Sequence, residues 1–467
     1  MGDIFEQSGW GPTSEFANIE RPRRRRRNPF AWRGYLTRYD GNTGEDLSSG
    51  RGAVEIRSNS FKIGRHPKSD LVLASPDISR EHACITRIGN VFHIEDLGSR
   101  HGTYVNGDRV LSCRLTDGDI LQFGYKNRLK NTLYFDRAAT REATAESDDQ
   151  TAKAPAQFRP KDRFTITFWG SRGSIPTPGP LTDAYGGNTT CVELRYGEQI
   201  FVLDAGTGIC KMSQNWVMEF GDSPLDVVLM FSHLHWDHIQ GFPFFSQAYQ
   251  ANNRLRIYGA DDKSATVRES LKQQMQGQFF PVPLEAMQAK MEFCNFDGPL
   301  QFGDVKVSRQ LLPHPGGAYA YRFETSDECF IFATDCELEA IIENQDEVRA
   351  RPSTPRRYPE EFLRFFEGAD YLVLDCQYSD ELYANRHGWG HNSLSTAIDF
   401  TIQVDPMAVA LTHHDPQSTD ADVRRMVDIA DASLRATMKS NASSVLAARE
   451  EMTVLIPDRR RTVELEE

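Results

Sequence analysis

The chain has 467 residues, which is too long for one hydrophobic core and predicts two or three domains. Its hydrophobic content of 39% and charged content of 25% are those of a water-soluble globular protein. No apolar run approaches the roughly 20 residues of a membrane-spanning helix, so we expect no membrane span. A net charge of −13 disfavours a long nucleic acid as partner, because phosphate backbones are bound through many lysine and arginine contacts.

The N-terminus shows no charged-then-apolar signal pattern, which favours a cytoplasmic location. The eight cysteines are scattered singly, with no C-x-x-C pair, and are expected to be reduced packing thiols. Residues 1–32 are rich in Gly, Pro, Ser and Arg and are expected to form a disordered tail. Arg21 and the run Arg23–Arg27 lie in this tail. Such a run could contact a nucleic acid, an anionic surface or an acidic partner, but it is more typical of a solvated segment.

Residues 33–137 contain short alternating strands separated by turn signals, which predict an all-β sandwich. The turn signals are Asp40-Gly41-Asn42, Gly89-Asn90, Asn106-Gly107-Asp108 and Asp117-Gly118-Asp119. Residues 138–162 are small, polar and charged, without an apolar period, and are expected to be a linker.

Three motifs follow one another in the predicted sandwich: Ile63-Gly64-Arg65, Ser79-Arg80-Glu81-His82, and a longer run over Asp96–Gly107. Their order and spacing resemble those of the forkhead-associated (FHA) family. The resemblance implies loops that bind phosphothreonine in a partner protein, with Arg65 and Ser79 on the phosphate and Arg80 and Arg100 assisting. A dianionic phosphate suits forked arginine donors and hydroxyl groups.

Two histidines of this region need separate treatment. In the FHA family the residue that matches His82 holds the loops together and does not contact the ligand. His101 stands where the family usually has an asparagine that grips the peptide backbone. This departure leaves the peptide selectivity open.

Residues 163–467 combine strand-like runs, at 164–168 and 200–203, with amphipathic stretches, which predicts one large α/β domain. The amphipathic stretches lie near 263–276, 359–367, 393–403 and 419–449.

The run His233-Leu234-His235-Trp236-Asp237-His238 follows the apolar stretch 227–231, which reads as a buried strand. Three imidazoles and a carboxylate are costly to bury unless they are paired or hold a metal. Their spacing is too close for one helix face, unlike the i, i+4 pair of a helical zinc site. A tight loop can direct two of them to one metal and two to its neighbour. The run therefore predicts a metal site.

This string is similar to the signature of the metallo-β-lactamase fold, and four further residues follow that family's order over about 164–457: Asp204, His314, Asp335 and His413. The resemblance implies an αββα sandwich that holds two divalent metal ions. It assigns His233, His235 and His314 to the first metal, and Asp237, His238 and His413 to the second. Asp335 would bridge both, and Asp204 would brace the loop. This ligand set suits Zn²⁺, with Mn²⁺ and Fe²⁺ left open.

The segments Phe168–Pro176 and Tyr185–Cys191 resemble the phosphodiesterase branch that includes ribonuclease Z and small cyclic-phosphate hydrolases. That branch uses a proton relay, whose places here are His391 and Asp375; with the ligand Asp237 these form the expected catalytic set. The departing alkoxide needs a proton, which His391 can donate when Asp375 orients it. Arg172 is expected to contact the phosphate.

We therefore expect a metal-dependent phosphodiesterase that hydrolyses a small phosphodiester, a 3′,5′-cyclic nucleotide in the first place. The FHA domain would couple it to Ser/Thr phosphorylation signalling. One alternative is a ribonuclease Z-like nuclease that processes RNA. Another is an FHA adaptor with an inactive hydrolase domain. Whether the protein forms a homodimer stays open.

Overall fold

The computed structural model describes residues 31–38, 54–58, 60–88, 91–106, 108–124, 131–140, 163–259, 264–437 and 444–456. The arginine run at 21–27 lies outside these residues, as do 1–30 of the tail predicted over 1–32 and 141–162 of the linker predicted over 138–162. Residues 31–32 of that tail and 138–140 of that linker belong instead to two paired strands. Among the described helices, none combines the length and the apolar character needed to cross a bilayer.

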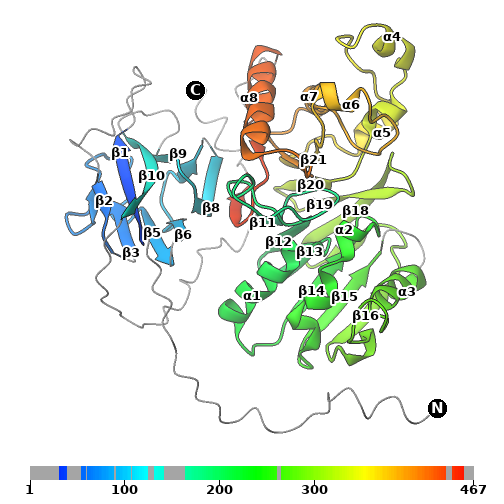
Figure 1. Cartoon of the computed structure of the whole chain (residues 1–467), viewed down its shortest axis with the longest axis horizontal. Helices are drawn as coiled ribbons and strands as arrows, with labels where there is room; N and C mark the ends of the chain where they lie inside the picture. Colours follow the sequence, from blue (N-terminus) through cyan, green and yellow to red (C-terminus); the bar gives the residue numbers. More distant parts are fainter. Residues whose placement is uncertain are drawn as a thin grey trace.

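The N-terminal part of the described chain folds into strands, drawn in blue and cyan in Figure 1. They are β1 (Ala31–Arg38), β2 (Val54–Ile56), β3 (Ser60–Gly64), β4 (Leu71–Val72), β5 (Ala83–Ile88), β6 (Val91–Asp96), β7 (Thr103–Val105), β8 (Asp108–Leu115), β9 (Asp119–Phe123) and β10 (Thr132–Thr140). Pairing follows the order β2-β1-β10-β9-β7-β8-β6-β5-β3-β4. Alternate residues such as Phe61 and Ile63 are buried while Lys62 is exposed, as expected for a strand with one face on a core. The predicted β-sandwich is confirmed.

Two further sheets make up the C-terminal part. The first runs in the order β24-β11-β12-β13-β14-β15-β16, and β13 to β16 are parallel. Its strands are β11 (Thr165–Gly170), β12 (Cys191–Tyr196), β13 (Gln199–Leu203), β14 (Asp226–Met230), β15 (Arg254–Tyr258), β16 (Lys290–Cys294) and β24 (Met452–Leu455). The second runs from β17 to β23 in chain order, and β20 to β23 are parallel. Its strands are β17 (Leu300–Phe302), β18 (Val305–Leu312), β19 (Ala318–Glu324), β20 (Cys329–Ala333), β21 (Tyr371–Asp375), β22 (Ala408–Thr412) and β23 (Ser444–Ala447).

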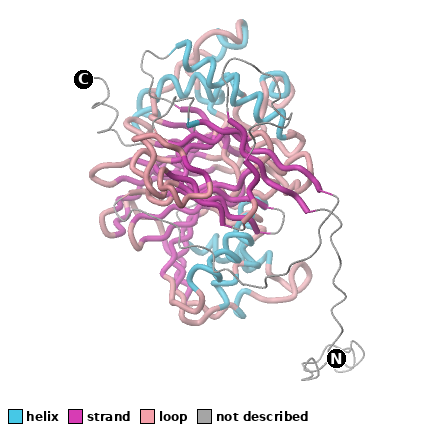
Figure 2. The backbone as a smooth tube through the Cα atoms, turned by 90° about the vertical axis from the view of Figure 1, so that its left-hand side faces the viewer, coloured by secondary structure: helices cyan, strands magenta, loops and turns pink. Residues whose placement is uncertain are grey.

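Helices cover the outer faces of these two sheets, and Figures 1 and 2 show the strands between two groups of helices. The α-helices are α1 (Gly208–Phe220), α2 (Trp236–Ile239), α3 (Ser264–Gln274), α4 (Gln345–Ala350), α5 (Glu360–Arg364), α6 (Asp380–Tyr383), α7 (Leu394–Val404) and α8 (Asp420–Thr437). Short 3-10 helices are η2 (Phe242–Phe244), η3 (Ser246–Tyr249), η4 (Leu284–Ala286) and η5 (Leu338–Ile341). The predicted αββα sandwich is confirmed.

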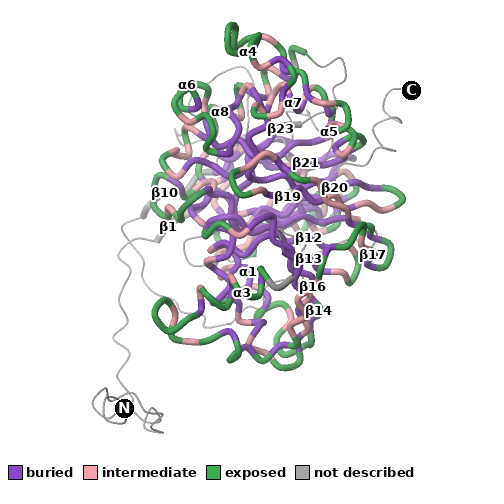
Figure 3. The backbone as a smooth tube through the Cα atoms, turned by 90° about the vertical axis from the view of Figure 1, so that its right-hand side faces the viewer, coloured by how far each residue is buried: buried purple, intermediate pink, exposed green. Residues whose placement is uncertain are grey.

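Strand β14 shows why the layers form. Val227 and Leu229 belong to the core cluster beneath α1 and α3, whereas Val228 and Met230 belong to the cluster between the two sheets. A strand buried on both faces carries a continuous apolar run rather than an alternating one. Figure 3 shows the same layering, with buried strands inside and exposed segments on the outer helices.

One predicted element was wrong at its C-terminal end. The amphipathic stretch expected over 419–449 ends as a helix at Thr437, and β23 (Ser444–Ala447) pairs with β22 in parallel. The segment Ser444-Val445-Leu446-Ala447 completes the second sheet because its apolar side chains are buried there, which a helical period does not require.

The two parts of the chain meet at an edge strand. Thr453 of β24 pairs with Ser112 of β8, which is a strand of the sandwich. Beside this pair, the buried guanidinium of Arg449 lies 3.3 Å from the Asp119 carboxylate of the sandwich. A second ion pair joins Arg114 to Asp183 at 2.7 Å.

Candidate functional site

The predicted metal-ligating residues follow strand ends. Asp204 comes directly after β13, the histidine run after β14, Asp335 after β20, and His413 after β22. Because β13–β14 and β20–β22 are parallel, their carboxyl ends lie at one edge of each sheet, where α/β proteins commonly bind ligands. His314 reaches the same place from the loop after β18. The fold therefore explains why residues far apart in sequence converge.

The first group contains the imidazoles of His233, His235 and His314, whose ligand atoms lie within 4.8 Å of one another. Nδ1 of His235 lies 3.0 Å from Nε2 of His314. The other ring nitrogen of His314, Nδ1, donates to the carbonyl of Gly390 at 2.9 Å. His233 is almost fully buried, and its Nδ1 lies 3.1 Å from the Ser232 hydroxyl. In His233 and His314, one ring nitrogen is thus held by the protein and the other faces the group.

The second group contains Asp237, His238 and His413, all buried. Oδ2 of Asp237 lies 3.3 Å from Nε2 of His238 and 3.3 Å from Nε2 of His413. The backbone amide of Ser174 donates to the same Asp237 oxygen at 2.8 Å, which fixes the carboxylate.

Asp335 lies between the two groups. Its Oδ1 is 3.2 Å from Nε2 of His238 and 3.3 Å from Nε2 of His413. Its Oδ2 is 3.7 Å from Nε2 of His233 and 3.9 Å from Nε2 of His314. Each oxygen of one carboxylate therefore faces a different group of ligand atoms.

Asp204 braces this arrangement from behind. It is fully buried, and its carboxylate accepts hydrogen bonds from the Ser232 amide at 2.7 Å and the Ser232 hydroxyl at 2.8 Å. Oδ2 also lies 2.8 Å from Nδ1 of His238, so it sets which nitrogen of that ring faces the group. Asp204, Asp335 and His413 all have left-handed backbone conformations, with φ of 61°, 52° and 61°. Such conformations are strained for non-glycine residues and persist only where the surroundings enforce them.

The charges in this cluster are strongly coupled. Burial would raise the pKa of Asp335, but the neighbouring imidazoles of His238 and His413 hold it well below its usual range. Burial would lower the pKa of His413, but the Asp335 and Asp237 carboxylates raise it to about 9. The negative charges of the carboxylates and the positive charges of the imidazoles thus stabilise one another at buried positions.

The donor set fits a pair of metal ions. Nε2 of His233 is buried and has no hydrogen-bond partner among the described residues; its nearest carboxylate oxygen, on Asp335, is 3.7 Å away. A buried imidazole nitrogen that lacks a partner is costly, and a metal ion is the usual way to satisfy it. Mixed imidazole and carboxylate ligands suit Zn²⁺, Mn²⁺ or Fe²⁺.

The predicted relay residues lie beside both groups. Nδ1 of His391 is 2.9 Å from Oδ2 of Asp375, whose other oxygen accepts from the Asn392 amide at 2.8 Å. The His391 ring stacks on that of His413, with centroids 4.7 Å apart. Ligand atoms of His391, His314 and Asp335 lie within 4.8 Å of one another. His391 therefore borders the space that both groups enclose.

Arg172 occupies a different place from the one expected. Its side chain is fully buried and donates to the carbonyls of Gly186, Asp415 and Ser418 at 2.8–3.1 Å. With no exposed surface it has no access to a phosphate, so the predicted substrate contact is wrong. Arg172 instead joins the loop between β11 and β12 to the loop between β22 and α8.

Two further residues contact the ligands and were not predicted. The Ser174 amide binds Asp237, and Oε1 of Gln377 lies 3.3 Å from Nδ1 of His413. Ser174 lies within the segment Phe168–Pro176 and Gln377 lies two residues after Asp375, but a serine amide and a glutamine carry no residue-type signal for metal chemistry. Their positions in the loops that follow β11 and β21 are the one feature that could have indicated a role at the site.

The predicted phosphopeptide residues also come together. Ser79 connects them: its carbonyl accepts from the Arg65 amide at 3.0 Å, and its hydroxyl accepts from the Arg100 amide at 3.0 Å. The His82 ring accepts from the Ser79 amide at 3.1 Å and donates to the Gly102 carbonyl at 3.0 Å. His82 is fully buried, whereas the side chains of Arg65, Arg80 and Arg100 are exposed.

Gly64 makes this loop arrangement possible. A Cβ at that position would lie 2.2 Å from the Arg80 carbonyl oxygen, so only glycine lets the two loops approach.

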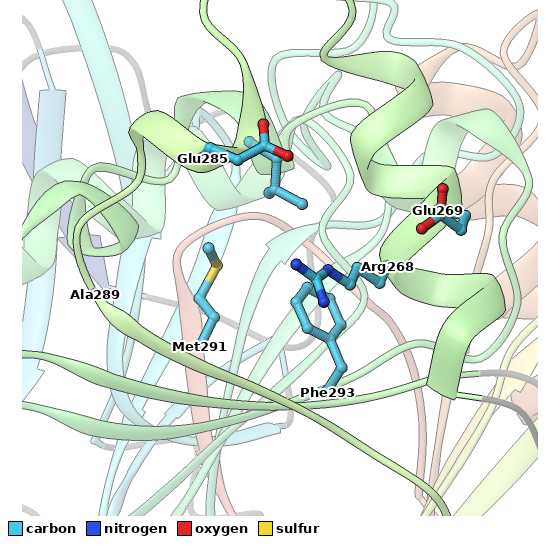
Figure 4. A pocket seen from close by; sticks show the side chains of 7 residues that line it. Arg268, Glu269, Glu285, Ala289, Met291 and Phe293 are labelled. Atoms are coloured by element: carbon cyan, nitrogen blue, oxygen red, sulfur yellow. The ribbon is translucent and has the colours of Figure 1, made fainter.

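A separate pocket lies between α3, η4 and β16 (Figure 4). It is lined by Arg268, Glu269, Leu284, Glu285, Ala289, Met291 and Phe293. The Arg268 guanidinium lies over the Phe293 ring at 5.9 Å. None of the predicted site residues lines this pocket.

Two family matches agree with the geometry. Residues 61–124 match the FHA domain, and residues 200–414 match the Beta-lactamase superfamily domain.

Individual relatives cover different parts of the chain. The chain is 46% identical over 61 residues to Glycogen accumulation regulator GarA of Mycobacterium tuberculosis, a segment that spans 13% of this chain and 38% of that protein. It is 24% identical over 287 residues to the Ribonuclease Z of Haloarcula marismortui, which covers 53% of this chain and 85% of that protein. The crystal structure of unliganded yeast PDE1 aligns with 63% of this chain and 100% of its own length, at 15% identity and a TM-score of 0.45.

Proposed function

We propose that this chain, an FHA domain followed by a hydrolase domain of the metallo-β-lactamase fold, is a metal-dependent phosphodiesterase. We infer a small phosphodiester as substrate, with a 3′,5′-cyclic nucleotide as the first candidate. The observation that carries this proposal is Asp335, whose two oxygens face two separate groups of metal-ligating side chains.

In this proposal the metal ligands divide as the geometry suggests. His233, His235 and His314 would hold one ion, and Asp237, His238 and His413 would hold the other, with Asp335 facing both groups. Two divalent ions bound there would supply Lewis-acid activation of water and of the phosphoryl oxygens. Asp204 orients His238, and the Gly390 carbonyl orients His314.

His391 supplies the proton that the reaction needs. A diester that loses an alkoxide must protonate the leaving oxygen, and general acids of this kind contribute about 10² to 10⁴ in rate. Asp375 accepts from Nδ1 of His391, so Nε2 is the nitrogen left to face the enclosed space. In the imidazolium form of His391, Nε2 carries the proton that is transferred to the leaving oxygen. Because Asp375 is fully buried, it holds this orientation without competition from water.

The substrate class rests on charge and size. The net charge of −13 disfavours a long polyanion, whereas a single phosphodiester requires only the metal ligands and the relay. A ribonuclease Z-like nuclease is the second candidate, favoured by the alignment of 287 residues with the archaeal Ribonuclease Z. The convergence of imidazoles and carboxylates that could hold metal ions argues against an inactive adaptor.

For the FHA domain we propose binding of a phosphothreonine segment in a partner protein. Three exposed arginines, Arg65, Arg80 and Arg100, lie near Ser79. The backbone amide of Ser79 donates a hydrogen bond to buried His82, which fixes this segment. Exposed guanidinium groups over a rigid scaffold suit a dianionic phosphate. This partner would place the hydrolase under the control of a Ser/Thr kinase.

The test uses the full chain stripped of metal and reloaded separately with Zn²⁺, Mn²⁺ or Fe²⁺. Substrates are a panel of 3′,5′-cyclic nucleotides, bis-p-nitrophenyl phosphate and a precursor transfer RNA, with D335N as the inactive control. We expect turnover of at least one cyclic nucleotide. Preferential cleavage of the RNA would replace the first candidate with the second, and no hydrolysis of any diester with any metal would refute both.

A further inference from the structure

Glu337 is a buried acidic residue that the proposed catalytic scheme leaves without a role. It lies two residues after Asp335 and is 6% exposed. Its Oε1 accepts hydrogen bonds from the Tyr383 hydroxyl at 2.8 Å and the Gly388 amide at 2.7 Å. Its Oε2 accepts from the Gly390 amide at 2.8 Å. The carboxylate thus binds three donors from a single segment, residues 383–390.

The backbone of Glu337 contacts the other side of the site. Its amide donates to the Pro313 carbonyl at 2.7 Å, and Pro313 precedes His314. Nδ1 of His314 donates to the Gly390 carbonyl at 2.9 Å. Because the Gly390 amide donates to Glu337, these contacts form a closed ring through Glu337, Pro313–His314 and Gly390.

Gly390 fits this ring with no space to spare. A Cβ there would lie 2.4 Å from Nδ1 of His314 and 2.4 Å from Cδ of Pro315. Gly388 and Gly390 both have left-handed backbones, with φ of 81° and 91°. Glycines have no conformational preference strong enough to hold such a segment by themselves. Backbone bonds from Arg386 to Tyr383 and from Trp389 to Arg386 shape the turn itself. The three hydrogen bonds to Glu337 tie this turn to the loop that follows β20.

The segment matters because His391 follows Gly390 directly. Asp375 orients the His391 ring, but it does not hold the backbone that carries the ring on its N-terminal side. The same Gly390 peptide unit also fixes His314 through its carbonyl oxygen. One carboxylate is thus placed to control a proposed metal ligand and a proposed proton donor together.

We propose that Glu337 is a positioning residue: by holding the amides of Gly388 and Gly390, it keeps the Gly390 carbonyl on His314 and sets His391 beside the metal-ligating cluster. This inference rests on the proposed function, because His391 acts as a proton donor only in a hydrolase.

The test compares Glu337→Gln with Glu339→Gln. Glutamine keeps the shape of the side chain but replaces one acceptor oxygen with an NH2 group. If its oxygen faces Tyr383 and Gly388, the NH2 group faces the Gly390 N–H, and two donors oppose each other. Glu339 is the matched control, because it lies two residues further along and bonds instead to Thr396 at 2.9 Å and to Arg356 at 3.4 Å.

The first readout needs no metal and no turnover. In metal-free protein with ¹⁵N-labelled histidine, the Nδ1 protons of His314 and His391 should be protected from exchange, since each is hydrogen bonded in a buried site. We expect E337Q to lose the protected His314 signal and to shift that of His391, and E339Q to keep both. Retention of both signals in E337Q would overturn the proposal.

The second readout uses leaving groups. A cyclic nucleotide releases an alkoxide, which needs the proton from His391, whereas bis-p-nitrophenyl phosphate releases a stable phenolate, which does not. At saturating metal, we expect E337Q to lower kcat for the cyclic nucleotide about tenfold or more beyond its effect on the phenolate ester. H391Q should lower kcat for the cyclic nucleotide relative to the phenolate ester in the same way. The double variant E337Q/H391Q should change this ratio of kcat values by less than about twofold relative to H391Q.

The outcomes separate the two proposals. An unchanged ratio of the two kcat values in E337Q, with wild-type turnover of both substrates, would refute the role of Glu337 and leave the phosphodiesterase intact, even if metal affinity or folding suffered. If the wild-type chain hydrolysed neither diester, the proposed function would fail, and the histidine signals alone would decide whether Glu337 positions the segment.

Discussion

The metal-ligating cluster and the phosphopeptide loops are built in opposite ways. In the cluster, charged and imidazole side chains are themselves buried, as Asp335 and His238 show at 2% and 0% exposure. In the FHA loops the buried residue is the scaffold, His82, and the charged groups such as Arg65 remain in water. In the proposed function, ions would satisfy the buried ligands as a resident cofactor, whereas the exposed arginines would keep their hydration until a phosphate binds. Under this proposal the first region suits a resident cofactor and the second a transient partner.

The largest effect should come from the shared carboxylate. Asp335→Asn keeps the shape of the side chain but removes the charge that both groups face. We therefore expect loss of at least one ion and a fall in kcat of more than about 100-fold. This exceeds the effect of about 10- to 100-fold that is typical of residues that only orient a metal ligand. Metal content and turnover of a diester measure this directly. Retention of two ions with unchanged kcat would show that the two groups do not share Asp335.

The brace behind the cluster should matter less than the ligand. Asp204→Asn keeps one acceptor oxygen, which can serve the Ser232 amide, but replaces the oxygen beside Nδ1 of His238 with an NH2 group and removes its negative charge. We expect metal affinity to fall about 10- to 100-fold, measured by competition with a chelating dye. An Asp226→Asn variant, on the exposed start of β14, serves as control and should leave the affinity unchanged. Equal affinities in D204N and D226N would contradict the proposed brace.

A substitution in the phosphopeptide loops should weaken peptide binding and leave the hydrolase activity unchanged. Arg65→Ala should weaken binding of a phosphothreonine peptide by about tenfold or more, because a charge-assisted hydrogen bond contributes about 1.5–3 kcal/mol. Fluorescence anisotropy of a labelled peptide gives the affinity, and kcat for a small diester should stay unchanged. A fall in kcat without added peptide would show that the two regions are not independent in the resting protein.

The smallest effect concerns the stability of the sandwich. Burial, with the nearby Asp96 charge adding to it, raises the pKa of Glu95 to about 7, above its ordinary value of 4.5. A neutral Glu95 therefore favours folding fully below about pH 4.5, and this contribution is lost as the pH rises through about 7. We expect Glu95→Gln to change the free energy of unfolding more favourably at pH 8 than at pH 5, by on the order of 1 kcal/mol. Thermal unfolding at both pH values tests this, with the exposed Glu81→Gln as control; an identical pH dependence in E95Q and wild type would refute it.

The sequence was most informative where chemistry and spacing act together. His233–His238 predicted a metal site because three imidazoles and a carboxylate at a strand end have few other uses, and the structure brings them together with His314, Asp335 and His413. The strand at 200–203 could be predicted because double-sided burial requires a continuous apolar run. The strand around 164–168 could be predicted from its aromatic and β-branched residues in alternation.

What the sequence could not give depends on contacts made over long distances in the chain. Arg172 looked suited to a phosphate, but its partners are the carbonyls of segments 14 and more than 200 residues away, which no local pattern reveals. Glu337 carries no signal beyond being an acid near Asp335, since its role depends on where residues 383–390 pass. The pairing of β24 with β8 likewise joins strands that are hundreds of residues apart.

The central claim is that Asp335 lies between two ions, and anomalous X-ray scattering from crystals of the metal-loaded chain tests it most directly. We predict two peaks on either side of the Asp335 carboxylate, one among His233, His235 and His314 and one among Asp237, His238 and His413. A single peak, a peak elsewhere in the molecule, or no bound metal at all would contradict the account.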